Sequence, residues 1–296
     1  ASPPTRNTLN ADSAPMAIDS KLVGTLREMT GAALMDCKRA LEEANGDLQA
    51  AVDVLRKKGL KNADKRAGRK AAAGRVHVQA SADQRAAAVV LMTSETDFVP
   101  PTDDFSGLLA KLTKLAFEKR IGSPGALLEQ TLGGTGVAEL VKALTGKCGE
   151  NIEVPQVVFF ENAKGFVGGY IHHDNKTAGF ASVTTDAPAE KTAEFLKQLG
   201  MHITFAKPTA LAREHISAET IEREKAVHRD SDDVKTKPEN KREMIVQGKL
   251  EKFFANSVIS EQPWFKDDST TVKKVLSETL GANSKIEAFA LFMVGA

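Results

Sequence analysis

The sequence has little of what membrane-spanning, disulfide-linked and base-stacking proteins need. Its 296 residues include two cysteines, one tryptophan and one tyrosine, and aromatic residues make up 5%. No apolar run approaches the roughly 20 residues that span a bilayer, so we expect no membrane partner. The net charge is +1, so no overall field favours nucleic acid. Cys37 and Cys148 lie in apolar periodic segments, which favours buried thiols in a reducing compartment over a disulfide.

Sequence signatures of catalysis are also missing. Gly146-Lys147 fails as a phosphate-binding loop, because Val141 stands where that motif has glycine and Cys148 replaces its hydroxyl residue. No dinucleotide-binding glycine pattern, nucleophile elbow or zinc-binding helix motif occurs. Residues 172–174 (His-His-Asp) are better explained as a turn after a strand than as metal ligands. We therefore expect a protein that is not an enzyme, with no cofactor and no bound metal.

The N-terminal part of the sequence predicts a tail, a small helical domain and a linker. Residues 1–15 show no periodicity and Met16 is a plausible start, so we expect a disordered tail over residues 1–20. Residues 21–60 carry three short helical periodicities, the last with Asp47 placed as its N-cap. A three-helix bundle of this size resembles a ubiquitin-associated (UBA) domain. Residues 61–75 are rich in lysine and arginine and predict a basic linker.

The rest of the chain predicts a duplicated α+β core. Strand, turn with proline, then amphipathic helix occurs around residues 86–117 and again around 178–205. The repetition is one of pattern rather than of identity. We expect two similar subdomains, 76–160 and 161–296, that share one interior. Two highly charged helices at about 217–256 predict an antiparallel helical hairpin, or coiled coil, inserted in the second subdomain.

Several short motifs, in a fixed order along the chain, identify a family. They are residues 26–41 (LREMTGAALMDCKRAL) with 42–47, residues 95–99 (ETDFV), 146–152 (GKCGENI), 200–203 (GMHI) with 206–208 (AKP), and 262–265 (QPWF). Together they make the sequence resemble the elongation factor Ts family over essentially residues 17–294. Their order makes the resemblance specific, whereas Thr-Asp-Phe-Val alone would be a weak signal.

The resemblance implies a guanine-nucleotide exchange factor for elongation factor Tu, acting by binding rather than by catalysis. Such a factor binds Tu in its GDP-bound and nucleotide-free states, displaces Mg²⁺ and promotes GDP release so that GTP can bind. The expected location is a bacterial cytoplasm, with a mitochondrion or plastid as the alternative. Relatives often continue past the last strand into a helix that touches Tu, so we expect binding here to rest on other contacts or to be weaker.

The resemblance assigns the displacement of Mg²⁺ to the run Thr96-Asp97-Phe98-Val99. Phe98 would act as an apolar wedge and Asp97 would bring a negative charge, while Thr96 and Val99 shape the turn. From the residues alone, the competing interpretation is that Phe98 packs in the core and Asp97 caps the turn.

Leu34 and Met35 are implied to be a second contact with Tu, at the start of the second helix. They could instead belong to the bundle core, although Cys37 and Leu41 already supply an inward face.

His202 is implied to be a third contact with Tu. The match is partial, because Thr204 and Phe205 stand where the family usually has small residues, and a buried core histidine is the alternative.

Two other functions compete with nucleotide exchange. A UBA-like interaction scaffold without exchange activity would bind ubiquitin through the loop at Met29-Thr30-Gly31. An RNA- or ribosome-associated protein would use the basic linker and show a steep salt dependence, which the net charge of +1 disfavours.

Overall fold

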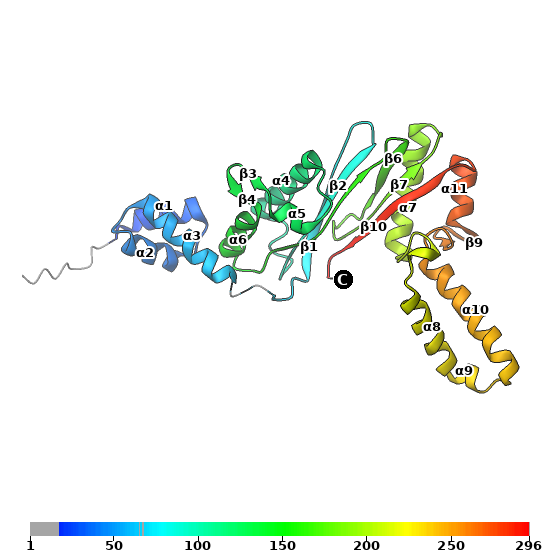
Figure 1. Cartoon of the computed structure of the whole chain (residues 1–296). Coiled ribbons are helices and arrows are strands. Elements are labelled where there is room, and N and C mark those ends of the chain that lie inside the picture. The colour runs from blue at the N-terminus through cyan, green and yellow to red at the C-terminus, as the bar shows by residue number, and fades with distance from the viewer. Residues whose placement is uncertain (1–17, 65, 67, 296) are drawn as a thin grey trace, which may run out of the picture. The chain divides into compact units, whose positions relative to one another are not determined.

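The computed structural model describes residues 18–64, 66 and 68–295, which form two compact units (Figure 1). The first contains the described residues up to Arg69 together with Ala138–Asn151, and the second contains Lys70–Val137 and the chain from Ile152 onward. Residues 1–17 of the predicted tail lie outside the described range.

The first unit is a helical bundle with a small apolar core. Asp19 accepts a hydrogen bond from Lys21 N (2.9 Å) and Asp47 from Ala50 N (2.7 Å), which satisfies backbone donors at two helix starts. Gly31, at φ 66°, ends the first helix in the left-handed conformation that glycine adopts without steric cost. The helices are α1 (Ser20–Thr30), α2 (Leu34–Glu43), α3 (Leu48–Asp64) and most of α6 (Val137–Cys148). The buried residues that form the core of α1, α2 and α3 are Val23, Leu26, Cys37, Ala40, Leu41 and Ala51.

Two glycines bring α3 and α6 into backbone contact within this unit. A Cβ built on Gly146 would lie only 2.7 Å from the Cα of Gly59. The sequence interpretation placed the helix at 137–147 in the subdomain 76–160 and ended the small domain at residue 60. In the structure α3 continues to Asp64 and α6 packs against it, while the predicted domain boundaries stay predictions.

The second unit begins with an antiparallel three-stranded sheet whose middle strand is β2. This strand is buried along nearly its whole length, because a long helix covers one face and a second sheet covers the other. The strands are β1 (Ala73–Ala80), β2 (Ala86–Ser94) and β5 (Glu153–Glu161), and the covering helix is α4 (Asp103–Lys119). Between α4 and β5 lie α5 (Pro124–Leu128), the short strands β3 (Thr131–Leu132) and β4 (Thr135–Gly136), and α6.

The second sheet has the same order. A hairpin supplies the first two strands, a long helix follows the second, and a later strand returns to pair with that second strand. These elements are β6 (Gly165–Ile171), β7 (Thr177–Thr184), α7 (Ala189–Ala206) and β10 (Lys285–Met293), with α11 (Val272–Leu280) beside α7. The two sheets share a core of Val76, Ala87, Val89, Leu91, Phe160, Val167, Ala178, Phe180 and Phe292.

The helix α7 lies in backbone contact with its sheet. A Cβ built on Gly200 would lie 2.4 Å from Tyr170 N and 2.6 Å from Gly179 O. No side chain fits between these backbones, so glycine at this point sets how closely the helix approaches the sheet.

A helical hairpin follows α7 and projects from the sheets (Figure 1). Its helices are α8 (Ala218–Asp230), α9 (Asp232–Lys235) and α10 (Glu239–Ser257). Beyond it come β8 (Pro263–Trp264) and β9 (Asp267–Thr271). Arg213, in the short helix η1 (Arg213–His215), holds the base: it donates to Glu261 (2.7 and 2.6 Å), pairs with Glu251 (2.8 Å) and lies over the Phe254 ring (4.5 Å). These carboxylates raise the pKa of Arg213 above its usual value.

The α+β class is confirmed by this mixture of helices and antiparallel sheets. The UBA-like description of the first helices and the duplication of the core stay predictions. Both cysteines are free, with Cys37 buried and Cys148 only half-buried, and burial raises the pKa of the Cys148 thiol.

Candidate functional site

The turn between β2 and α4 carries the run Thr96-Asp97-Phe98-Val99 that was predicted to displace Mg²⁺, called the tip below. Thr96, Asp97 and Phe98 are exposed, whereas Val99 and Pro100 are buried. The exposed fraction of Phe98 is 83%, the highest among the large apolar side chains that the structure describes as exposed. The alternative that Phe98 packs in the core is therefore wrong, and the next residue fills that place.

Hydrogen bonds fix the shape of this turn. Ser94 Oγ donates to Thr96 O (2.8 Å), and the backbone N and the Oγ1 of Thr102 both donate to Val99 O (3.0 and 2.7 Å). Thr102 also caps α4, because its Oγ1 accepts from Phe105 N (3.4 Å), and Phe105 is fully buried beneath it. Phe98 therefore stands on a turn that is anchored on both sides.

Val99 anchors the turn. Its side chain is 8% exposed and holds the turn from within, and its predicted part in partner binding stays a prediction. The exposed part of the tip is Thr96-Asp97-Phe98.

The tip carries negative charge around its apolar residue. Asp97 is exposed beside Phe98, and Asp103 and Asp104 follow in the first turn of α4. Carboxylates near a helix N-terminus are stabilised by the helix dipole, so the fold tolerates this charge. The arrangement can deliver a phenyl ring and a carboxylate together to a partner.

His202 lies in the core, not on the surface. It is 0% exposed, its Nε2 donates to Gln262 Oε1 (2.9 Å), and its ring stacks on Trp264 at a centroid distance of 5.3 Å. Burial lowers the pKa of His202, which favours the neutral ring. The structure therefore places His202 where the alternative of a buried core histidine put it, and its contact with Tu stays a prediction.

Gln262 explains why the histidine is held so firmly. Its amide nitrogen donates to Ala206 O (3.2 Å) and Asn256 O (2.6 Å), so its oxygen is left facing His202. This chain of bonds joins the end of α7 to the end of α10. His202 thus positions the base of the helical hairpin against α7.

Sequence reasoning passed over a second exposed phenylalanine. Phe205, in the last turn of α7, is 73% exposed. The inward stripe of this helix is Phe195, Leu199, His202 and Ile203, so Phe205 falls outside it. A large apolar residue off the apolar stripe was the available signal.

The first unit exposes the predicted pair Leu34 and Met35, at 51% and 59%. Cys37 and Leu41 are buried, as the helical spacing predicted, so the pair is not needed for the bundle core. Its contact with a partner stays a prediction. Met29, at the end of α1, is exposed as well.

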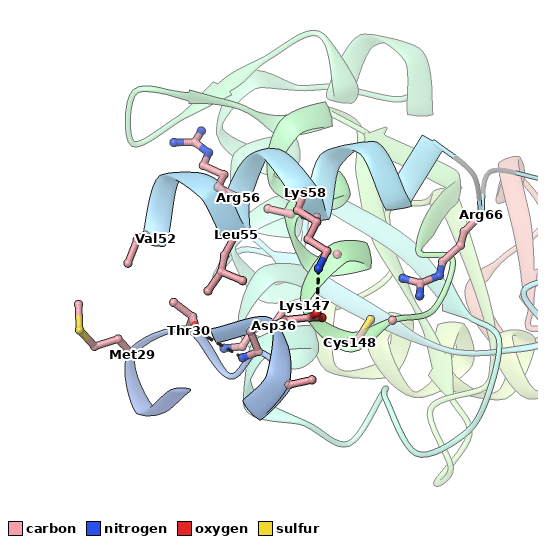
Figure 2. Close-up of a pocket in the computed structure, with 16 residues that line it drawn as sticks. Met29, Thr30, Asp36, Val52, Leu55, Arg56, Lys58, Arg66, Lys147 and Cys148 are labelled. Atoms are coloured by element: carbon pink, nitrogen blue, oxygen red, sulfur yellow. Dashed lines mark hydrogen bonds and ion pairs between the residues drawn. The ribbon is translucent and has the colours of Figure 1, made fainter. Parts of the chain in front are cut away.

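A cavity of about 580 Å³ lies in the first unit, between α3, the loop after α1 and the end of α6 (Figure 2). Several charges on its wall already pair: Lys58 with Asp36 at 2.8 Å, and Arg56 with Glu139 at 3.6 Å. Lys58 holds the pKa of Asp36 below its usual value. These pairs bridge helices, so we assign the cavity no ligand.

Two features are absent from the part of the chain that the structure describes. No cluster of His, Cys, Asp or Glu there could hold a metal ion, and no helix there is long and apolar enough to cross a bilayer.

Comparison with known proteins settles the family. The Elongation factor TS family model matches residues 95–296, which begin at the tip. The elongation factor Ts of Prosthecochloris aestuarii is 37% identical over 286 residues, covering 94% of this chain and 99% of that protein. The chain belongs to the elongation factor Ts family.

Members from other bacteria match to a similar degree. Elongation factor Ts of Alkalilimnicola ehrlichii is 37% identical over 95% of this chain and 93% of its own length. That of Trichlorobacter lovleyi is 36% identical over the same shares. Membership in the family places the chain in translation elongation, within protein biosynthesis.

Proposed function

We propose that this protein is a guanine-nucleotide exchange factor for elongation factor Tu, not a catalyst. It binds Tu carrying GDP, displaces Mg²⁺ and releases GDP so that GTP can bind. The observation that carries the proposal is Phe98, exposed on a braced acidic tip in a chain of this family.

The physical basis is linkage between two ligands of Tu. A factor that binds nucleotide-free Tu more tightly than the GDP-bound form weakens GDP by the same free energy. For tightly held GDP the difference must reach several kcal/mol, so the factor needs contacts that only the nucleotide-free form offers.

Phe98 and Asp97 supply two such contacts. Full burial of a phenylalanine side chain contributes about 1.5–3 kcal/mol. Because the turn is already anchored, little conformational entropy is lost when it binds. The carboxylate of Asp97 disfavours a phosphate group nearby, and loss of Mg²⁺ removes the main charge that neutralises the phosphates. Wedge and charge therefore act on the same site of Tu.

Release of fluorescent GDP from Tu tests the function directly. We expect the wild-type protein to accelerate release, and Phe98→Ala to lower the maximal rate at saturating protein by about tenfold or more. Lys119→Ala, exposed at the opposite end of α4, is the matched control and should behave as wild type. Unchanged GDP release with saturating wild-type protein would rule out exchange, while a normal rate with Phe98→Ala would remove the wedge alone.

The role of Asp97 is tested by varying Mg²⁺. If the carboxylate acts by displacing the ion, Asp97→Asn should be slow at millimolar Mg²⁺ and regain the wild-type rate when a chelator removes the metal. A deficit that persists without Mg²⁺ would show that Asp97 contributes only to binding.

Leu34 and Met35 are proposed as a separate docking contact. Their exposure on α2 means that replacing both with alanine should leave the fold unchanged. We expect weaker binding to Tu with a normal maximal rate, as measured by titrating the release assay. A lower maximal rate would mean that the first unit also takes part in displacing the nucleotide.

A further inference from the structure

We propose that Phe205 is a second apolar anchor for the partner that receives Phe98. The proposal rests on the proposed function and adds a contact residue to it. Its basis is that both exposed phenylalanines stand on one edge of the second unit.

The end of α7 lies at the edge formed by the turn between β6 and β7. Gly200 and Ile203 contact Gly179, near the start of β7. Leu196, one turn earlier in α7, contacts Gly168 of β6, which lies farther from the turn at residues 172–176. The helix therefore runs toward the turn at residues 172–176, and Phe205 lies beyond Ile203 in that direction.

The end of β2 lies at the same edge. Val76 N donates to Asn175 O (2.8 Å), so the β6–β7 turn touches β1 at its fourth residue, which pairs with Leu91 of β2. Ala73 of β1 is paired with Ser94, the last residue of β2. The tip that starts at residue 95 and the last turn of α7 thus flank one turn.

The structure holds Phe205 outward. The inner side of α7 is filled by Leu199, His202 and Ile203, all buried, so the ring has no place in the core. The helix cannot roll easily, because Gly200 is in backbone contact with the sheet. Lys207, at φ 48°, ends the helix two residues later. A rigid exposed aromatic ring is the kind of side chain that dominates binding energy at protein interfaces.

The partner that covers Phe205 is elongation factor Tu, because Phe205 lies on the same edge as Phe98. A protein large enough to accept Phe98 at one end of the edge extends across the turn at residues 172–176 to the other. Phe205 has no metal, cofactor or phosphate chemistry of its own. Its contribution is apolar contact with the same partner, at a distance from the nucleotide.

The test separates affinity from rate. Phe205→Ala should weaken binding to nucleotide-free Tu about tenfold or more, as measured by titration, with a normal maximal rate of GDP release. Phe205→Leu, which keeps an apolar side chain, should recover most of the affinity. Met244→Ala, which removes a similarly exposed apolar side chain from α10, is the control and should bind as wild type.

Each outcome has a distinct meaning. If wild type accelerates release and Phe205→Ala binds equally well, the anchor is wrong and the proposed function stands. If the wild-type protein fails to accelerate GDP release, the proposed function is wrong, and so is the anchor that rests on it. If sedimentation shows that wild type self-associates and Phe205→Ala does not, the occupant is a second copy and the proposal is overturned.

Discussion

The two sheets of the second unit share one strand order but differ in the turn that follows the middle strand. In the first, eight residues (95–102) join β2 to α4, and Phe98 projects from them. In the second, four residues (185–188) join β7 to α7. There Thr185 Oγ1 donates to Leu280 O (3.2 Å) and Ala187 packs on the core. The longer connection makes the exposed tip possible, while the short one is tied to neighbouring elements.

The helices after these turns differ in a complementary way. Thr102 caps α4 with its side chain, whereas Pro188 precedes α7 without a side-chain cap. At Gly200 the backbone of α7 lies in contact with the backbone of its sheet. A Cβ built on Gly107 of α4 would instead meet open space. The first half is secured at its tip, and the second along its helix.

The largest expected effect breaks the contact in the second half. Gly200→Val forces a side chain between two backbones and should destabilise the protein by about 3 kcal/mol or more. Gly107→Ala, at the open position of α4, should instead stabilise it by roughly 0.5–1 kcal/mol. Denaturant unfolding measures both. If Gly200→Val changed the free energy of unfolding no more than Gly107→Ala does, α7 could move away from the sheet without cost.

A smaller effect concerns Thr102, the residue that caps α4 in the first half. Thr102→Ala removes the cap of α4 and the side-chain bond to Val99 O, and should cost about 1 kcal/mol. It should also slow GDP release from Tu, because the tip loses one of its supports. Thr102→Ser keeps the hydroxyl and should keep both properties. If stability falls but release is unchanged, the tip does not depend on its support.

The smallest effect is a pH dependence carried by one histidine in each half, the half-buried His77 and the fully buried His202. Burial lowers the pKa of His77 in β1 and of His202 in α7 below the ordinary value of 6.5. The unfolded chain therefore binds more protons, so stability is present above about pH 6.5 and is lost as pH falls through the folded-state pKa values. His202→Gln should flatten the change in Tm between pH 7.5 and 5.5. An unchanged slope would assign the dependence to His77.

The sequence predicted the order of the main elements because their apolar periodicities are strong. The two stretches predicted as strand, turn with proline and helix, around residues 86–117 and 178–205, correspond to β2 with α4 and to β7 with α7. The short strands β3 and β4, of two residues each, have no periodicity to detect.

Side-chain direction at the tip could not be predicted in the same way. Phe98 and Val99 are adjacent apolar residues in a turn, where the alternation of a strand has ended, so pattern alone cannot say which is buried. The partner of α6 was missed because a Gly59–Gly146 contact leaves no apolar signature. For His202, the sequence left a buried core histidine open as the alternative to a partner contact.

The stack of His202 on Trp264 has a spectroscopic consequence. Trp264 is the single tryptophan of the chain, and it also stacks on Phe195 at 6.2 Å. Indole emission therefore reports on one place, where α7 meets the base of the helical hairpin. If that junction opens before the sheets unfold, fluorescence will change ahead of circular dichroism, and the two curves will separate without any added label.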